Sequence, residues 1–433
     1  MKKLFLLDAN AQAFSQKEKN LYHLLLFFFF SIYMPHVSWL YNVAMWLVFL
    51  YCFLFNSIKE KLVLLKQRKA MLLMALFFLF NCISLLWSSN IDEGVSWIGI
   101  RISLLAFPIS IGSIYINALL RERLWYAFLV ATCAGAIVSI IHASFLAIQQ
   151  QDLSLLYNDN LSEYVNLQSI YFAMLINLAL FGLVSLQVNK SFLVGRYTWL
   201  IALIILLPVH FLLASRIAIT ILYGTILLFA AFVIVYKKML KQGIMLVAGL
   251  LLAAFLLLQL FPKTINRFKE LGYTHYNYSS TAPESHFNMA LTPEQWNGAN
   301  LRLAVWSCAW EGIKESFLFG TGIGDTMDEL KKQYAAKGFT FGITTNRNVH
   351  STYLDIWISM GLIGLLIFIA GFFILPYMQC IQYRDLYGLL VLTALMLSTI
   401  SEVYLNRTTG NTILAFFICF IVSCKKAKVK ENY

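Results

Sequence analysis

Charged residues are scarce in this sequence. Asp, Glu, Lys and Arg make up only 12% of its 433 residues, whereas 60% are hydrophobic and the mean hydropathy is +0.72. A water-soluble core could not hide that much apolar surface. The composition therefore excludes a soluble globular protein and indicates an integral membrane protein.

Cysteine is almost absent from the polar part of the chain. Six of the seven cysteines lie in or against apolar runs, which leaves Cys308 alone in a long polar stretch. One thiol forms neither a disulfide framework nor a Cys-x-x-Cys metal site, and the histidines show no ligand spacing, so no metal and no other cofactor is expected. The N-terminus also lacks a short apolar segment followed by a cleavage site, so residues 1–20 are expected to remain as a cytoplasmic tail.

Long apolar runs fill most of the remaining sequence. A helix needs about 20 apolar residues to cross roughly 30 Å of hydrocarbon, and a window of this length finds about twelve candidate spans. They lie near residues 21–37, 39–56, 70–88, 97–119, 125–148, 167–187, 198–214, 217–236, 243–261, 352–378, 386–404 and 410–424. The predicted fold is an all-α polytopic membrane helix bundle of about 12 transmembrane helices.

The cations predict how these spans are oriented. They gather in the loops after spans two, four, six and eight and after the last span, at Lys59, Lys61, Lys66, Arg68, Lys69, Arg121, Arg123, Lys190, Arg196, Lys237, Lys238, Lys241, Lys425, Lys426, Lys428 and Lys430. The opposite loops carry mainly acidic residues. By the positive-inside rule the basic side is cytoplasmic, with both termini on it, and the formal net charge of +12 requires no nucleic acid as a partner.

This orientation divides the chain into five parts. Residues 1–20 are the cytoplasmic tail, 21–261 hold the first nine spans, 262–351 form one large extracytoplasmic (periplasmic) loop with short helices, 352–424 hold the last three spans and 425–433 are a second cytoplasmic tail. The expected location is the cell inner (cytoplasmic) membrane. Chemistry that consumes ATP is excluded from the large loop.

A predicted helix at 301–317 in this loop carries a cation beside indoles. Arg302, Trp306 and Trp310 recur every four residues and so share one face. Guanidinium groups bind phosphate through two parallel hydrogen bonds, and aromatic faces suit sugar rings. The alternative is an interfacial helix in which tryptophan marks the membrane surface and arginine anchors headgroups.

His350 stands where the loop re-enters the apolar part of the chain. An imidazole can accept a proton near neutral pH, so His350 is a candidate general base, and a helix-start histidine bonded to backbone is the alternative. Glu402 lies near the outer end of the eleventh span and close to Arg407. It can pair with a cation, either structurally or at a site.

Two further arginines adjoin apolar runs. Arg216 follows Ser215 in a turn too short to be a loop, so its charge is expected at the outer mouth of the bundle. Arg101 lies about one turn inside the fourth span, where a charge normally faces a cavity or a partner. Snorkelling of the side chain to the headgroups is the alternative for both. The glycine-rich stretch 320–324 is expected to be a tight turn between helices rather than a phosphate-binding loop.

The order and spacing of these motifs resemble the O-antigen ligase and polymerase superfamily over roughly residues 70–420. The motifs are Leu86-Trp87-Ser88 ahead of Arg101 and Pro108, Ser215-Arg216, Arg302 with Trp306, the glycine-rich stretch 319–324, the stretch 350–354 leading into the stretch 361–365, and Ser401-Glu402. Members of this superfamily typically have Asn after the histidine and an acidic residue before the first glycine of the next span. Here those positions are Ser351 and, nearby, Ser359-Met360.

The resemblance implies a metal-independent inverting glycosyltransferase. Such an enzyme moves a glycan from an undecaprenyl-diphosphate-linked donor to an acceptor hydroxyl, on lipid A-core for a ligase or on another glycan for a polymerase. Arg216 and Arg302, together with Arg101, are implied to bind the diphosphate, with His350 as base. Trp306 and Glu402 are further candidates for substrate binding. A non-enzymatic transporter of lipid-linked sugars is a different class that twelve spans also fit.

Overall fold

The computed structural model describes residues 14–35, 37, 39–189, 191–235, 238–260, 268–285 and 295–424. All regular elements among these residues are helices, so the predicted all-α class is confirmed. One isolated bridge pairs Glu284 with Trp296, and no strand is present in the described part of the chain. The expected C-terminal tail at 425–433 and most of the expected N-terminal tail lie outside the described residues.

In chain order, the helices are α2 (Gln16–Ser31), α3 (Trp39–Phe55), α4 (Ile58–Gln67), α5 (Lys69–Ser84), η2 (Leu85–Trp87), α6 (Ile91–Arg101), α7 (Ser103–Ile109), η3 (Ile111–Ser113), α8 (Ala118–Gln150), η4 (Leu153–Leu156), α9 (Asn158–Ser162), α10 (Ser169–Val188), α11 (Arg196–Leu212), α12 (Arg216–Val235), α13 (Leu240–Leu260), η5 (Glu270–Gly272), α15 (Asn300–Glu315), α16 (Thr326–Ala336), α17 (Thr340–Thr344), α18 (Thr352–Ile369), η6 (Ala370–Ile374), α19 (Leu375–Gln382), α20 (Leu386–Ser398), η7 (Tyr404–Asn406) and α21 (Thr408–Ser423).

Several helical segments are long and apolar enough to cross a membrane. Among the described residues there are five, and α3 with α4 makes a sixth if this pair, bent by 103°, is one span. The five are Lys69–Trp87, Ile91–Ser113, Ala118–Gln150, Ser169–Val188 and Thr352–Gln382. Shorter apolar helices occupy Tyr197–Leu212, Arg216–Ala231, Gly243–Leu252, Leu386–Ser398 and Thr408–Ser423. The chain is a multi-pass membrane protein, and a helix overlaps each of the predicted spans.

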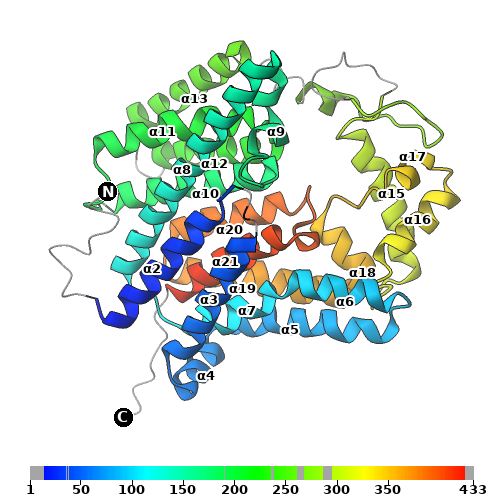
Figure 1. Ribbon diagram of the computed structural model, residues 1–433, viewed down its shortest axis with the longest axis horizontal. Helices are drawn as coiled ribbons and strands as arrows, with labels where there is room; N and C mark the ends of the chain where they lie inside the picture. Colours follow the sequence, from blue (N-terminus) through cyan, green and yellow to red (C-terminus); the bar gives the residue numbers. More distant parts are fainter. Residues whose placement is uncertain are drawn as a thin grey trace.

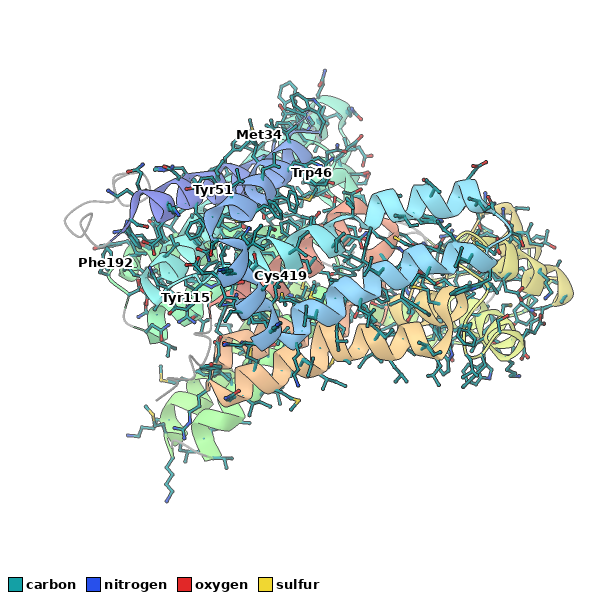
Figure 2. The ribbon with its side chains drawn as sticks, turned by 90° about the horizontal axis from the view of Figure 1, so that it is seen from below. Met34, Trp46, Tyr51, Tyr115, Phe192 and Cys419 are labelled. Atoms are coloured by element: carbon teal, nitrogen blue, oxygen red, sulfur yellow. The ribbon has the colours of Figure 1, made fainter. Side chains whose placement is uncertain are left out.

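The apolar helices form one bundle, and α15, α16 and α17 gather at one end of it (Figure 1). α21 runs through the middle, where Cys419 lies among the surrounding helices (Figure 2). Phe416 on α21 contacts Phe28 and Phe107 from two other helices, at ring-centroid distances of 5.1 and 5.6 Å. A smaller apolar core holds α15 and α16 together around Cys308 and Tyr334.

Several boundaries differ from those predicted, and three of these differences have a local cause or a consequence for the site. α2 begins at Gln16 rather than at residue 21, because Ser15 and Glu18 form a capping box that starts the helix early. The basic stretch after α3 was expected to be a loop but forms α4, which a second capping box at Ser57 begins. α20 ends at Ser398 rather than at 404, and the chain from 399 to 407 turns back toward the start of α18.

The glycine-rich stretch 320–324 is a turn, as predicted, and it docks on α18. The amide of Thr321 donates to the Ile358 carbonyl (2.8 Å), and the amide of Leu362 donates to the Phe317 carbonyl (2.9 Å). Gly320 and Gly361 have positive φ angles of 72° and 65°, and a Cβ at either would overlap the backbone of the other segment. Glycine is therefore required at both positions.

Candidate functional site

A cavity of about 790 Å³ lies between the membrane helices and the α15–α17 end of the molecule. Its lining comes from the starts of α10, α12 and α15, from the loop before α15, from residues 347–350 and from residues 401–407. Five of the six predicted site residues line it: Arg216, Arg302, Trp306, His350 and Glu402. The sixth, Arg101, does not.

Arg216 and Arg302 meet beside Gly298. A Cβ added to Gly298 would overlap Nη2 of Arg216 and would lie 3.2 Å from Nη1 of Arg302. The Arg302 guanidinium also donates to the carbonyls of Gly298 (2.5 Å) and Ser401 (3.3 Å), which fixes its position at the first turn of α15. The two guanidinium groups thus come together from helices about 85 residues apart in sequence, and adjoining guanidinium groups suit an anion.

His350 lies beside Glu402 in the same cavity. Nδ1 of His350 is 3.8 Å from Oε2 of Glu402, and both side chains are largely buried. His350 has a left-handed backbone conformation (φ 45°), and its amide donates to Oδ1 of Asn348 (3.0 Å). A carboxylate next to one ring nitrogen is the arrangement that orients an imidazole for proton transfer.

Trp306 is hydrogen-bonded to the backbone next to His350. Its indole Nε1 donates to the carbonyl of Val349 (2.8 Å), the residue before His350. Trp310, on the same side of α15, packs edge-on against Trp357 on α18, with 5.5 Å between the ring centroids. On the helix face predicted from the four-residue spacing, Arg302 and Trp306 thus line the cavity, whereas Trp310 contacts α18.

Arg101 is enclosed by protein. It is only 2% exposed, and its Nη2 lies 3.2 Å from Oδ2 of Asp355. Nη1 donates to Oδ1 of Asn81 (2.7 Å), and Nη2 also donates to Oδ1 of Asn406 (3.2 Å). Of these partners only Asn406 lines the cavity.

The N-terminal ends of five helices border the cavity. α10, α12, α15, α18 and α21 each contribute a residue at or just before their first turn to its lining. The aligned peptide dipoles make each such end partly positive, which favours an anion nearby. This field adds to the charge of the arginines.

Several charged residues in or beside the cavity were not predicted as site residues, among them Arg347 and Asp355. Arg347 lines the cavity and forms an ion pair with Glu284, which approaches from the loop before α15. Asp355 is buried on α18 beside Arg101. An acidic residue inside an apolar span is itself a signal of a partner, so Asp355 could have been found in the sequence. The pairing of Arg347 with Glu284 depends on tertiary structure and could not.

No group of three His, Cys, Asp or Glu side chains suited to a metal ion occurs among the described residues. The one cysteine of the polar stretch, Cys308, is buried in the small core of α15 and α16, and this burial raises the pKa of its thiol. A raised pKa keeps the thiol protonated and makes it a poor nucleophile.

One comparison with known proteins covers part of this region. The chain matches a family model described as O-antigen ligase over residues 200–369, a range that includes Arg216, Arg302, Trp306 and His350. No curated protein matches the chain. Residues 200–369 therefore form an O-antigen ligase family domain within this membrane protein.

Proposed function

We propose that this protein transfers a glycan from an undecaprenyl-diphosphate-linked donor to an acceptor hydroxyl at the outer face of the cytoplasmic membrane. The observation that carries the proposal is the meeting of Arg216 and Arg302 at Gly298, in the cavity that His350 and Glu402 also line. A diphosphate needs neighbouring cations, and an acceptor hydroxyl needs a base. The two arginines and the histidine line the same cavity.

The donor diphosphate binds at Arg216 and Arg302 in this proposal. Two guanidinium groups and the surrounding helix N-termini neutralise its charge, and the same groups stabilise the additional charge that develops as the diphosphate leaves. The arginines do for the leaving group what a divalent cation does in many phosphate-dependent enzymes. The proposed reaction accordingly requires no metal.

His350 acts on the acceptor. Its imidazole takes the hydroxyl proton while the acceptor oxygen attacks the anomeric carbon. The bond from that carbon to the diphosphate oxygen breaks, and its electron pair leaves with undecaprenyl diphosphate. Attack opposite the leaving group inverts the anomeric configuration. Glu402 holds the imidazole in place and stabilises the imidazolium that forms.

The proposal includes a topology. We infer about twelve transmembrane helices, made of the long spans, the shorter apolar helices and α2, with residues 262–351 outside the cytoplasm. The basic loops support this orientation. It brings the cavity to the outer face of the inner membrane, where a lipid-linked glycan and a lipid A-core acceptor are both accessible.

A ligase and a polymerase use the same chemistry and differ in the acceptor. We favour the ligase, which attaches the glycan to lipid A-core in lipopolysaccharide biosynthesis, because the matched family is described as O-antigen ligase. The polymerase, which extends the glycan by its own repeat unit, is the alternative. Glycan analysis of a deletion strain separates the two: unligated long chains indicate a ligase, and short chains indicate a polymerase.

A transporter of lipid-linked sugars is the other class. Transporters bind their substrates near the middle of the membrane between broken helices. In this protein the arginines, His350 and Glu402 gather next to the polar α15–α17 end, which favours an enzyme. The direct test is transfer by the purified protein from a lipid-linked glycan donor to lipid A-core. Movement of donor across vesicles without transfer would support the transporter instead.

A further inference from the structure

A buried ion pair crosses the bundle just behind the cavity. Arg101 on α6 and Asp355 on α18 are 2% and 3% exposed, and their side chains lie 3.2 Å apart. Asn81 on α5 accepts a further hydrogen bond from Arg101 (2.7 Å). Charges within membrane spans are costly to bury, and an apolar pair would often stabilise a bundle as well or better. The pair therefore calls for a role beyond stability.

Arg101 and Asp355 both form hydrogen bonds with the side-chain amide of Asn406. Oδ1 of Asn406 accepts from Nη2 of Arg101 (3.2 Å), and Nδ2 of Asn406 donates to Oδ1 of Asp355 (3.3 Å). Nε of Arg101 also donates to the Leu405 carbonyl (3.4 Å). The amide oxygen of Asn406 faces the guanidinium of Arg101, and its amide nitrogen faces the carboxylate of Asp355. The side-chain amide therefore has one favoured orientation.

Asn406 belongs to a short stretch that builds one side of the cavity, which we name the 401–407 segment. It has little regular structure apart from the single turn η7. Glu402, beside His350, and Arg407 both line the cavity from this segment. At its other end, Thr352 donates from its amide (3.1 Å) and its hydroxyl (2.7 Å) to the Glu402 carbonyl, which ties the segment to the start of α18.

We propose that Arg101 and Asp355 are a positioning pair that holds the 401–407 segment, through Asn406, at the distance from His350 that catalysis requires. This inference rests on the proposed function. The pair does not reach the cavity, so it is not a substrate ligand. Arg216 stands on α12, and Arg302 keeps its hydrogen bond to the Gly298 carbonyl even if its longer one to Ser401 is lost, so loss of the pair should disturb turnover more than donor binding.

The test compares Asp355→Asn, Arg101→Lys and Asn406→Ala with the wild-type protein. The asparagine variant removes the carboxylate charge, and the lysine variant keeps the cation but cannot make all the contacts of the guanidinium. The alanine variant leaves the pair intact and removes the link through the Asn406 side chain, so that the 3.4 Å contact of Arg101 with the Leu405 carbonyl remains. Hydrogen–deuterium exchange over 401–407 and transfer kinetics per folded molecule are measured for each. We expect faster exchange in this segment, at least tenfold lower kcat and a donor Kd changed by less than threefold. Because Asn406→Ala leaves both charges paired, it tests the proposal even if the other variants fail to fold.

Arg68→Gln is the matched control. Arg68 is a buried arginine that donates to backbone carbonyls of Gly112, Ile114 and Ser423, at the other end of α21 from the 401–407 segment. Sixteen helical residues separate the two ends by about 24 Å. Its loss should lower stability without changing exchange over 401–407 or turnover per folded molecule.

Two results would overturn the positioning role. One is unchanged exchange over 401–407 in Asn406→Ala, and the other is faster exchange with wild-type kcat. Failure of the proposed function looks different, because the wild-type protein would then transfer no glycan to any acceptor. In that case the exchange measurement still decides whether the pair holds the segment.

Discussion

Nδ1 of His350 lies 3.8 Å from Oε2 of Glu402, although 52 positions of sequence separate the two residues. This distance is longer than a hydrogen bond, and it places a carboxylate oxygen next to a ring nitrogen. Loss of either side chain should therefore affect the same proton transfer.

Removing the charge of Glu402 should slow the reaction. We expect Glu402→Gln to lower kcat by about tenfold to a hundredfold, the scale of partners that orient a functional histidine. Adding Glu402→Gln to His350→Ala should then cost little more, since the two residues act as one unit. Steady-state transfer by the single and double variants checks this. Additive losses would mean that Glu402 acts independently of the histidine.

His350→Ala should leave a folded, membrane-inserted protein with turnover reduced by about a hundredfold or more, the range for a general base. Donor binding should fall much less, because the arginines hold the diphosphate. The measurement is in vitro transfer alongside donor binding for the same variant. Turnover near that of the wild type would remove His350 from the chemistry, and a parallel loss of binding would make it a diphosphate ligand.

Replacing Arg216 or Arg302 by lysine keeps the charge and removes the planar fork. We expect either change to impair transfer and to weaken donor binding, because lysine cannot make two parallel hydrogen bonds to phosphate oxygens. Lysine at 302 should also lose the hydrogen bond to the Ser401 carbonyl. Full activity of both lysine variants would identify these arginines as headgroup anchors.

A methyl group at Gly298 tests the same anion site without changing any charge. The Cβ of Gly298→Ala would overlap the Arg216 guanidinium and push it away from Arg302. We expect weaker donor binding and little loss of thermal stability. Gly99→Ala is the matched control, since a Cβ there meets nothing within 4 Å. Equal donor affinity in both variants would show that Arg216 can shift without consequence.

The orientation of the chain can be tested by cysteine labelling in a cysteine-free background. Thr344→Cys, in the exposed part of the 262–351 loop, should react with a membrane-impermeant reagent in cells whose outer membrane alone is permeable. Lys66→Cys on α4 should react only after the inner membrane is opened. The reverse pattern would invert the proposed topology and move the cavity to the cytoplasmic side.

The helices could be predicted from the sequence, but their ends could not. A run of about 20 apolar residues is enough to predict a helix, and a helix overlaps each predicted span, although the 97–119 stretch is divided among α6, α7 and η3. α4 was missed because lysines interrupt its apolar residues. A search for runs of about 20 apolar residues does not detect such an amphipathic helix. The early end of α20 depends on contacts of residues 399–407 with Thr352, which lie outside any local pattern.

The site residues were predicted from their places in the sequence, whereas their pairings required the fold. Arg216, Arg302 and His350 were singled out next to apolar runs or beside indoles, the resemblance implied their roles, and the structure brings all three to one cavity. Nothing local to Arg101 indicates that its partner stands 254 positions later. A costly charge in a span predicts that some partner exists, but packing alone determines which residue it is.

The glycine contact between the 317–322 stretch and α18 affects how the protein should respond to its bilayer. Backbone meets backbone at Gly320 and Gly361, so α15 and α18 cannot slide past each other, and the spacing of Arg302 and His350 is fixed before any substrate arrives. Arg216 belongs to α12, and among the described residues no such backbone contact joins α12 to α15. A thicker or thinner membrane tilts spans, so a change in lipid chain length should alter donor affinity through Arg216 and leave the proton-transfer geometry at His350 unchanged.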